Sequence, residues 1–227
     1  MKALVLFSGG IDSTTALALA INKYGKDRVI ALSVSYGQKH DKEIQAAIAV
    51  AEYYGVEHLF LDLRKIFTYS NCSLLKQSTE KIPEESYAKQ ISKTNGETPV
   101  STYVPFRNGL FLSSAASIAI SKDCEVISYG AHADDSAGFA YPDCSPVFNR
   151  AMNEAIWEGS GHQLKIEAPF VNVSKAEVVR IGLELNVPYE LTWSCYEGGE
   201  KPCGKCGTCI DRAAAFQANH VEDPALQ

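Results

Sequence analysis

The sequence has 227 residues, of which 46% are hydrophobic and 21% are charged, and its formal net charge is −6. This composition is typical of a globular protein and argues against the broad basic surface that nonspecific nucleic-acid binding requires. No run approaches the roughly 18 consecutive apolar residues of a transmembrane helix, and the N-terminus lacks the layout of a signal peptide. We therefore expect a cytoplasmic protein that acts on a small molecule, with no direct nucleic-acid partner and no membrane partner.

The N-terminal segment predicts a strand, a tight loop and a helix. Residues 3–7 form a short, continuously apolar run that ends at glycine, which is typical of a buried parallel strand. A helical pattern follows from Thr14, so residues 8–13 (SGGIDS) join strand to helix. Gly9 and Gly10 permit backbone conformations that a Cβ would block, and amide groups near a helix start bind anions. The loop therefore predicts a phosphate site, and the alternative is a glycine turn with a serine cap.

The kind of phosphate site follows from what this loop lacks and what it resembles. It has neither the lysine signature of a P-loop nor the third glycine of the dinucleotide-binding fingerprint. It resembles the pyrophosphate loop, SGGxDS, of the ATP pyrophosphatase (PP-loop) enzymes, matched here by Ser8, Gly9, Gly10, Asp12 and Ser13. Enzymes of that family cleave ATP between the α and β phosphates. The resemblance thus implies that the loop holds the departing pyrophosphate.

Strand and helix patterns alternate along the next part of the chain. Residues 28–35 and 58–63 predict strands, and residues 39–54 predict a helix between them. Alternation with helix-length connections predicts a parallel sheet with helices on both faces. We therefore expect an α/β fold like that of the adenine-nucleotide alpha hydrolases.

Residues 64–104 interrupt this alternation. Most of the segment is polar, rich in Ser, Lys and Glu, and has no sustained period. A segment of this length without strong elements is more often a lid or a mobile loop than a packed part of the core. We expect it to be a lid that is partly disordered without ligand.

The alternation resumes with a predicted helix at residues 107–121 and a strand at 125–129. This strand leads into a loop that carries Asp134, Tyr141 and Asp143. Ligands of open parallel sheets bind beyond the carboxyl ends of the strands. The loop and the SGGIDS segment are therefore expected to meet over one pocket.

Three more elements complete the predicted first domain, which we assign to residues 1–190. Residues 147–158 and 174–185 predict helices, and residues 164–167 predict a short strand. The second of these helices begins with an S-x-x-E capping box that joins Ser174 and Glu177.

Residues 191–227 are predicted to form a small metal-binding module with a C-terminal helix. Cys195, Cys203, Cys206 and Cys209 are separated by seven, two and two residues. Four thiolates bind zinc tetrahedrally and leave no open position for substrate, so one structural Zn²⁺ per chain is expected to clamp the helix near residues 211–219 onto the body. Two disulfides, an iron–sulfur cluster or a Cys-x-x-Cys redox pair could also account for these cysteines.

Further motifs indicate a particular family. YGQKH, VPFRN, YPDC and WSCYEG begin at Tyr36, Val104, Tyr141 and Trp193. Together with the SGGIDS loop and the cysteines, in this order, they resemble the 7-cyano-7-deazaguanine synthases over residues 3–215. The resemblance implies a carbon–nitrogen ligase that adenylates 7-carboxy-7-deazaguanine, adds ammonia, adenylates the amide and releases the nitrile, a queuosine precursor. It further implies a homodimer.

The resemblance and the expected chemistry together assign site residues, with ATP and Mg²⁺ as cofactors beside the zinc. The residues expected to bind ATP are Phe7, Ser8, Gly9, Gly10, Asp12, Ser13, Thr14 and His40. Those expected to bind the deazaguanine acid are Arg107, Asn108, Asp134, Tyr141 and Asp143. Catalytic roles are expected for Ser8, Asp12, Ser13 and Arg107.

One position departs from the family pattern. The YPDC motif is commonly followed by Arg in the family, whereas Ser145 follows here. A cation for a carboxylate or phosphate is then missing unless Arg107 or Arg150 supplies it. The departure leaves open a relative that adenylates the same acid for another amine. A PP-loop enzyme that modifies tRNA and a noncatalytic zinc-bearing module are two further hypotheses that the motifs leave open.

Overall fold

The computed structural model describes residues 1–93 and 95–226, and a parallel sheet forms the centre of this part of the chain. The sheet has five strands in the order β3-β2-β1-β4-β5. The strands are β1 (Ala3–Leu6), β2 (Val29–Ser35), β3 (Glu57–Asp62), β4 (Val126–Ser128) and β5 (Lys165–Glu167). Every pairing is parallel, so the predicted fold class is confirmed.

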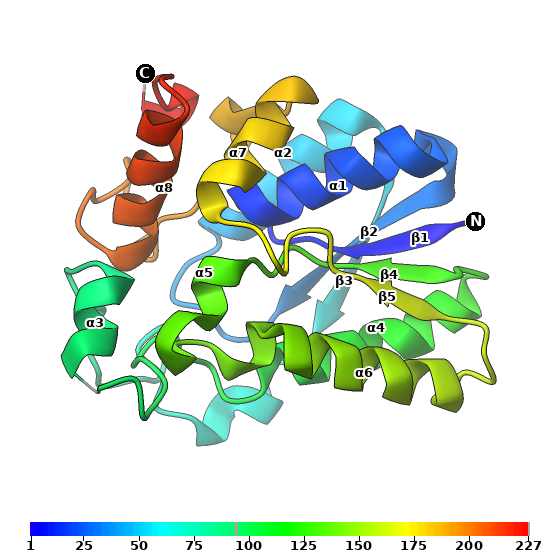
Figure 1. Cartoon of the computed structure of the whole chain (residues 1–227), viewed down its shortest axis with the longest axis horizontal. Coiled ribbons are helices and arrows are strands. Elements are labelled where there is room, and N and C mark those ends of the chain that lie inside the picture. Colours follow the sequence, from blue (N-terminus) through cyan, green and yellow to red (C-terminus); the bar gives the residue numbers. More distant parts are fainter. Residues whose placement is uncertain (94, 227) are drawn as a thin grey trace.

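Helices cover both faces of this sheet (Figure 1). One face carries α1 (Ile11–Tyr24), α2 (Lys42–Tyr54) and α7 (Lys175–Glu184), with α8 (Gly207–Ala218) packed on α7. The other face carries α4 (Arg107–Ser121) and α6 (Pro146–Gly159). The short helices α3 (Tyr87–Lys93) and α5 (Ala133–Ser136) lie beyond the carboxyl ends of the strands. Short 3₁₀ helices span Lys26–Arg28, Ile66–Tyr69, Ala137–Phe139, Pro142–Cys144, Tyr189–Leu191 and Pro224–Leu226.

The buried strands explain why the core has two layers. Successive residues of a strand point to opposite faces of the sheet. In β1, Val5 packs with the α1, α2 and α7 side, whereas Leu4 and Leu6 pack with the α4 and α6 side. All four residues of β1 are buried, as expected for a central parallel strand with helices on both faces.

Several predicted boundaries are wrong by a few residues. The first helix begins at Ile11, not Thr14, because Gly10 takes the extended backbone of an N-cap. The second begins at Lys42, and the last begins at Gly207 rather than near 211. The capping box at Ser174 is half formed: its hydroxyl accepts the N–H of Glu177 at 3.3 Å, but the Glu177 carboxylate pairs with Arg180.

The prediction that residues 64–104 contribute no packed core is also wrong. Phe67, Leu75 and Ile82 are buried in a third apolar cluster, together with cysteines of the C-terminal module. The polar composition concealed these contacts, since the apolar residues occur singly or in pairs and show no period. A role as a lid is still a prediction.

A buried ion pair fixes the C-terminus to the body. The side chains of Arg212 on α8 and Asp223 are each less than a tenth exposed, and two hydrogen bonds of 2.5 and 2.8 Å join them. Arg212 also donates to the Thr192 hydroxyl and the Tyr189 carbonyl. The guanidinium therefore connects α8 to the segment that precedes the cysteines.

The substitution Asp223→Ala should destabilise the fold by about 3–5 kcal/mol, because it leaves the Arg212 charge buried without its partner. The exposed pair of Glu177 and Arg180 offers a control, and Glu177→Ala should cost no more than about 1 kcal/mol. Urea unfolding of both variants measures the difference. Equal free energies of unfolding for the two variants would contradict the assigned role of the buried pair.

Candidate active site and metal centre

A cavity of about 240 Å³ opens at the carboxyl end of the sheet. The loops after β1, β2 and β4 border it, together with the first turns of α1, α2, α4 and α7. Another part of its wall comes from the cysteine module, through Trp193, Ser194, Tyr196 and Thr208. The prediction that the loops after β1 and β4 meet over one pocket is thus confirmed.

The SGGIDS loop is held by its own hydroxyl groups. The Ser8 and Ser13 hydroxyls lie 3.0 Å apart, the Ser8 N–H donates to the Ser13 hydroxyl, and that hydroxyl donates to the Gly10 carbonyl. Gly10 caps α1 without a side-chain hydrogen bond. The first N–H groups of a helix have no partner within the helix, so those of α1 border the cavity as anion donors.

Gly9 is packed too closely against α2 to carry a side chain. A Cβ there would lie 2.5 Å from the amide nitrogen of Ala47 and 2.7 Å from the carbonyl oxygen of Glu43. Gly9 also has a φ of +80°, which L-residues with side chains rarely adopt. The loop therefore packs directly against the backbone of α2, and only glycine fits at position 9.

A compact charged cluster borders the α1 side of the cavity. Lys175, at the start of α7, places its Nζ 2.9 Å from Asp12 Oδ2, and His132 Nε2 lies 3.7 Å from Asp12 Oδ1. Burial opposes ionisation of Asp12, but the charges of Lys175 and His132 outweigh it and hold its pKa below the usual value. For Lys175, Asp12 outweighs burial in the same way and raises the pKa. Asp12 is thus an anion and Lys175 a cation at neutral pH.

Asp12 has a carboxylate oxygen available for a cation. Its Oδ1 is buried and has no hydrogen-bond partner among the described residues. Mg²⁺ prefers one or two carboxylate oxygens together with oxygens of phosphate groups and water. A carboxylate beside the phosphate loop therefore fits the Mg²⁺ that PP-loop enzymes use.

Another wall of the cavity carries Arg107 from α4, Tyr36 from the loop after β2 and Glu43 from the first turn of α2. Arg107 Nη1 lies 3.4 Å from the Tyr36 hydroxyl, and the guanidinium lies over the Tyr36 ring, 5.3 Å from its centroid. Burial raises the pKa of Glu43 to about 7, and the charge of Arg107 opposes this shift. Burial also raises the pKa of Tyr36, so the tyrosine is neutral.

Asn108 and Asp143 fix the start of α4 rather than both facing the cavity. The Asn108 N–H donates to Asp143 Oδ2 at 2.8 Å, and the Asn108 amide donates to the Asp143 carbonyl and to the Cys144 sulfur. Asn108 and Cys144 border the cavity, but Asp143 does not. Asp143 therefore holds the first turn of α4, which positions Arg107.

Three tyrosines line the side of the cavity nearest to the module. Tyr87 of α3 shares a 2.7 Å hydrogen bond with the Tyr196 hydroxyl, and its ring meets that of Tyr141 edge to face. The Tyr141 hydroxyl lies 2.6 Å from that of Thr102. Residues 64–104 thus supply part of the cavity wall through Tyr87.

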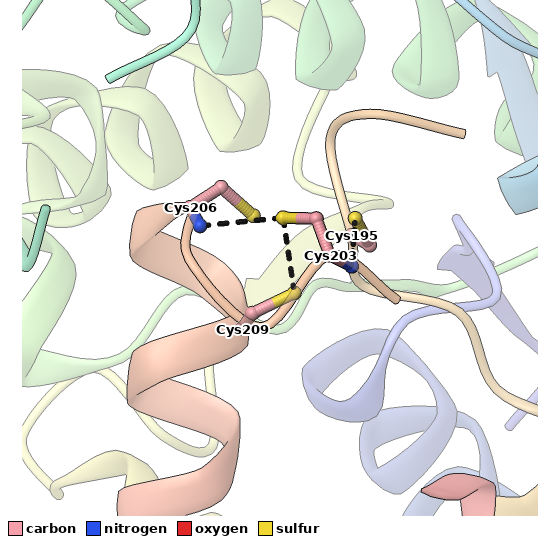
Figure 2. Close-up of side chains that lie close together, drawn as sticks. All are labelled: Cys195, Cys203, Cys206 and Cys209. Atoms are coloured by element: carbon pink, nitrogen blue, oxygen red, sulfur yellow. Dashed lines mark hydrogen bonds between the residues drawn. The ribbon is translucent and has the colours of Figure 1, made fainter. Parts of the chain in front are cut away.

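The four cysteines of the module converge on one point (Figure 2). Their sulfur atoms all lie within 4.8 Å of one another. The N–H of Cys203 donates to the Cys195 sulfur at 3.3 Å, and the N–H groups of Lys205 and Cys206 donate to the Cys203 sulfur at 3.4 Å. Such donors stabilise thiolates, so the cluster can hold a metal ion.

Most of the residues predicted to bind ATP or substrate border the cavity, namely Phe7, Ser8, Gly10, Asp12, Ser13, Arg107, Asn108 and Tyr141. Gly9, Thr14, His40, Asp134 and Asp143 do not. Thr14 is buried within α1, and the His40 ring packs against Trp193. Asp134 accepts the N–H of Lys175 at 2.8 Å, and its neighbour Asp135 borders the cavity instead.

The cavity residues that were not assigned from the sequence include Tyr36, Tyr87, Tyr196 and Glu43. Tyr36 and Tyr196 stand inside motifs that pointed to the family, yet neither was given a role. Tyr87 belongs to the segment interpreted as a mobile loop. Glu43 lies in an ordinary amphipathic helix, and no pattern around it indicated a function.

Comparisons with known proteins agree on one family. The model of the family described as queuosine biosynthesis protein QueC matches residues 2–220. A 7-cyano-7-deazaguanine synthase of Archaeoglobus fulgidus is 42% identical over 227 residues, covering 100% of this chain and 90% of that protein. One from Caldicellulosiruptor saccharolyticus is 42% identical, covering 99% of this chain and 94% of that protein.

Two solved structures share the fold. An NMN synthetase from Francisella tularensis has a TM-score of 0.53 at 17% identity, covering 97% of this chain and 78% of that one. A tRNA thiolase from Methanococcus maripaludis, described with a 4Fe–4S cluster, has a TM-score of 0.53 at 18% identity. The alignment covers 97% of this chain and 67% of that one. At these identities the likeness concerns the fold alone. No helix in the described part of the chain is long and apolar enough to cross a membrane.

Glu43 should make the stability of the protein depend on pH. Its pKa rises from 4.5 to about 7 on folding, so the folded state retains a proton that the unfolded state releases between those values. Stability should therefore fall by on the order of 2 kcal/mol as pH rises from 4.5 to 7, and Glu43→Gln should abolish this loss. Urea unfolding at about pH 5 and at about pH 8 measures this change in the free energy of unfolding. Parallel pH dependences in the parent and the variant would contradict the assignment.

Proposed function

This chain belongs to the QueC family of queuosine biosynthesis proteins, and we propose that it is the ligase that converts 7-carboxy-7-deazaguanine and ammonia, with ATP, into 7-cyano-7-deazaguanine. The observation that carries the proposal is the single cavity that joins the pyrophosphate loop to the guanidinium of Arg107. One wall suits the phosphates of ATP, and the other suits a carboxylate.

The chemistry explains why ATP is split at the α phosphate. Oxide and hydroxide are poor leaving groups from carbon, whereas AMP is a good one. The carboxylate attacks the α phosphorus, and ammonia then displaces AMP to give an amide. The amide oxygen takes a second AMP, whose loss leaves the nitrile. Each attack builds charge on the departing pyrophosphate, which the N–H groups and hydroxyls of Ser8–Ser13 are placed to stabilise.

Asp12 and Lys175 serve the phosphate end of the cavity in this proposal. Asp12 would hold Mg²⁺ through the oxygen that has no hydrogen-bond partner in the described part of the chain. The ion supplies positive charge to the phosphate oxygens when it is bound. Lys175, 12% exposed, orients the Asp12 carboxylate and can reach a phosphate oxygen.

Arg107 is the cation that we assign to the substrate carboxylate. Ser145, which stands where Arg is expected after YPDC, caps α6: its hydroxyl accepts the N–H of Phe148 at 3.1 Å. Arg150 is exposed on α6 and does not border the cavity, whereas Arg107 does. Arg107 is therefore the residue able to compensate. Tyr87, Tyr141 and Tyr196 offer rings for the flat base.

We assign one structural Zn²⁺ to the four cysteines. Thiolates around one zinc ion at about 2.3 Å lie about 3.8 Å apart, and the observed sulfurs are all within 4.8 Å. A four-iron cluster binds each cysteine through a different iron atom and so spreads the sulfurs farther apart. The compact arrangement favours a single ion.

The cytoplasmic location and the homodimer belong to the proposal as well, on the strength of the family resemblance. A related enzyme that delivers the adenylated acid to another amine is the second candidate, because Ser145 departs from the family pattern. The acidic net charge of −6 disfavours a tRNA substrate.

The reaction is tested by mass spectrometry of products after incubation with ATP, Mg²⁺, ammonium and 7-carboxy-7-deazaguanine. We expect the nitrile together with AMP and pyrophosphate. AMP without amide or nitrile would indicate another amine acceptor. No AMP at all would show that the acid is not the substrate.

The substitution Arg107→Lys should raise the KM for the acid by about 10- to 100-fold, because an ammonium cannot make the paired hydrogen bonds of a guanidinium. The KM for ATP should change much less. Arg150→Lys, on an exposed position of α6, is the matched control and should leave both constants unchanged. An unchanged KM for the acid in Arg107→Lys would show that Arg107 does not bind the substrate carboxylate.

The substitution Cys206→Ser should remove the bound metal and destabilise the module, since three thiolates leave the tetrahedral site incomplete. Cys124→Ala, a buried cysteine outside the cluster, should keep one zinc per chain. Elemental analysis of the purified proteins gives the metal content. Iron with acid-labile sulfide in the parent protein would contradict the zinc assignment and indicate an iron–sulfur cluster.

A further inference from the structure

Among the described residues, three carboxylates border the cavity, and one of them has no partner. Asp12 is paired with Lys175, and Asp135 lies 3.3 Å from His132 Nε2. Glu43 makes no side-chain hydrogen bond or ion pair with any described residue. Its carboxylate is therefore free to accept a proton from a molecule in the cavity.

Glu43 is held in this position by the packing of α2. It lies in the first turn of that helix, whose backbone is in close contact with Gly9 of the phosphate loop. The groups that face it are Arg107 from α4 and the neutral Tyr36 from the loop after β2. Because Arg107 is assigned to the substrate carboxylate, Glu43 lies on the side of the cavity where that carbon would react.

The proposed reaction requires a base at that carbon. Ammonia adds to the carbonyl carbon of the acyl adenylate through a new C–N bond, and the resulting ammonium must lose a proton as the C–O bond to AMP breaks. The product is the neutral amide, and the bonding electrons leave with AMP. In the second round the amide loses both remaining N–H protons: one as its oxygen displaces pyrophosphate from ATP, and one as AMP leaves and the C≡N bond forms.

We propose that Glu43 is the general base that takes these N–H protons. The inference rests on the proposed function. The pKa of about 7 suits the task, because a base is most effective when its pKa is near the working pH. Asp12 and Asp135 are less suited to this role. Asp12 is already paired with Lys175, and Asp135 lies next to the His132 ring.

The test uses Glu43→Gln in the full-length protein, with three measurements. Exchange of labelled pyrophosphate into ATP, with the acid and without amine, reports adenylation and should stay within about threefold of the parent. Amide and nitrile formation from ammonium should fall by about 100-fold or more, the usual contribution of a general base. Hydroxamate formation from hydroxylamine should be nearly preserved, because the N-protonated adduct of hydroxylamine is far more acidic than that of ammonia and can lose its proton to water.

Two further variants sharpen the result. Glu52→Gln removes an exposed carboxylate from the same helix and should behave as the parent in all three measurements. Glu43→Asp keeps a carboxylate and should regain part of the ammonium-dependent rate. Normal amidation by Glu43→Gln would overturn the proposal, and so would a parallel loss of pyrophosphate exchange, which would make Glu43 a residue for ATP binding. Absence of exchange in the parent would instead contradict the proposed function.

Discussion

The site depends on the close contact between Gly9 and α2. No side chain fits there, since a Cβ would lie 2.5 Å from the Ala47 nitrogen. The contact fixes the phosphate loop at the end of β1, so the first N–H groups of α1 stay open to an anion. The same contact fixes the first turn of α2, and that turn carries Glu43 to the cavity. One tight approach thus positions both the phosphate site and the carboxylate assigned to proton transfer.

Charge divides the cavity into two ends. Asp12 and Lys175 form the end that suits phosphates and Mg²⁺, and Arg107 forms the end that suits a carboxylate. A carboxylate at one end and a triphosphate at the other can meet at the α phosphorus, as the proposed adenylation requires. The cysteine module and residues 64–104 close the remaining side through Tyr196 and Tyr87, which share a hydrogen bond. The cysteine module and residues 64–104 therefore support the wall on which the flat ring system of the substrate would lie.

The sequence allowed the sheet, its helices and the phosphate loop to be predicted, because buried parallel strands and glycine turns have local patterns. It did not predict the packed interior of residues 64–104, whose buried residues such as Leu75 show no period. Ser8 and Arg107 lie in sequence motifs, so their position at the cavity could be predicted. Glu43 and the ion pair of Lys175 with Asp12 depend on contacts between distant segments, and no local pattern encodes them.

The most direct test of two successive adenylations is the fate of the substrate oxygens. The acid is prepared with ¹⁸O at both carboxylate positions and converted with unlabelled ATP, ammonium and Mg²⁺, and the AMP is analysed by mass spectrometry. We expect two AMP for each nitrile, each carrying one ¹⁸O atom, and no ¹⁸O in pyrophosphate. Label in pyrophosphate or in water, or one AMP for each nitrile, would contradict two successive adenylations.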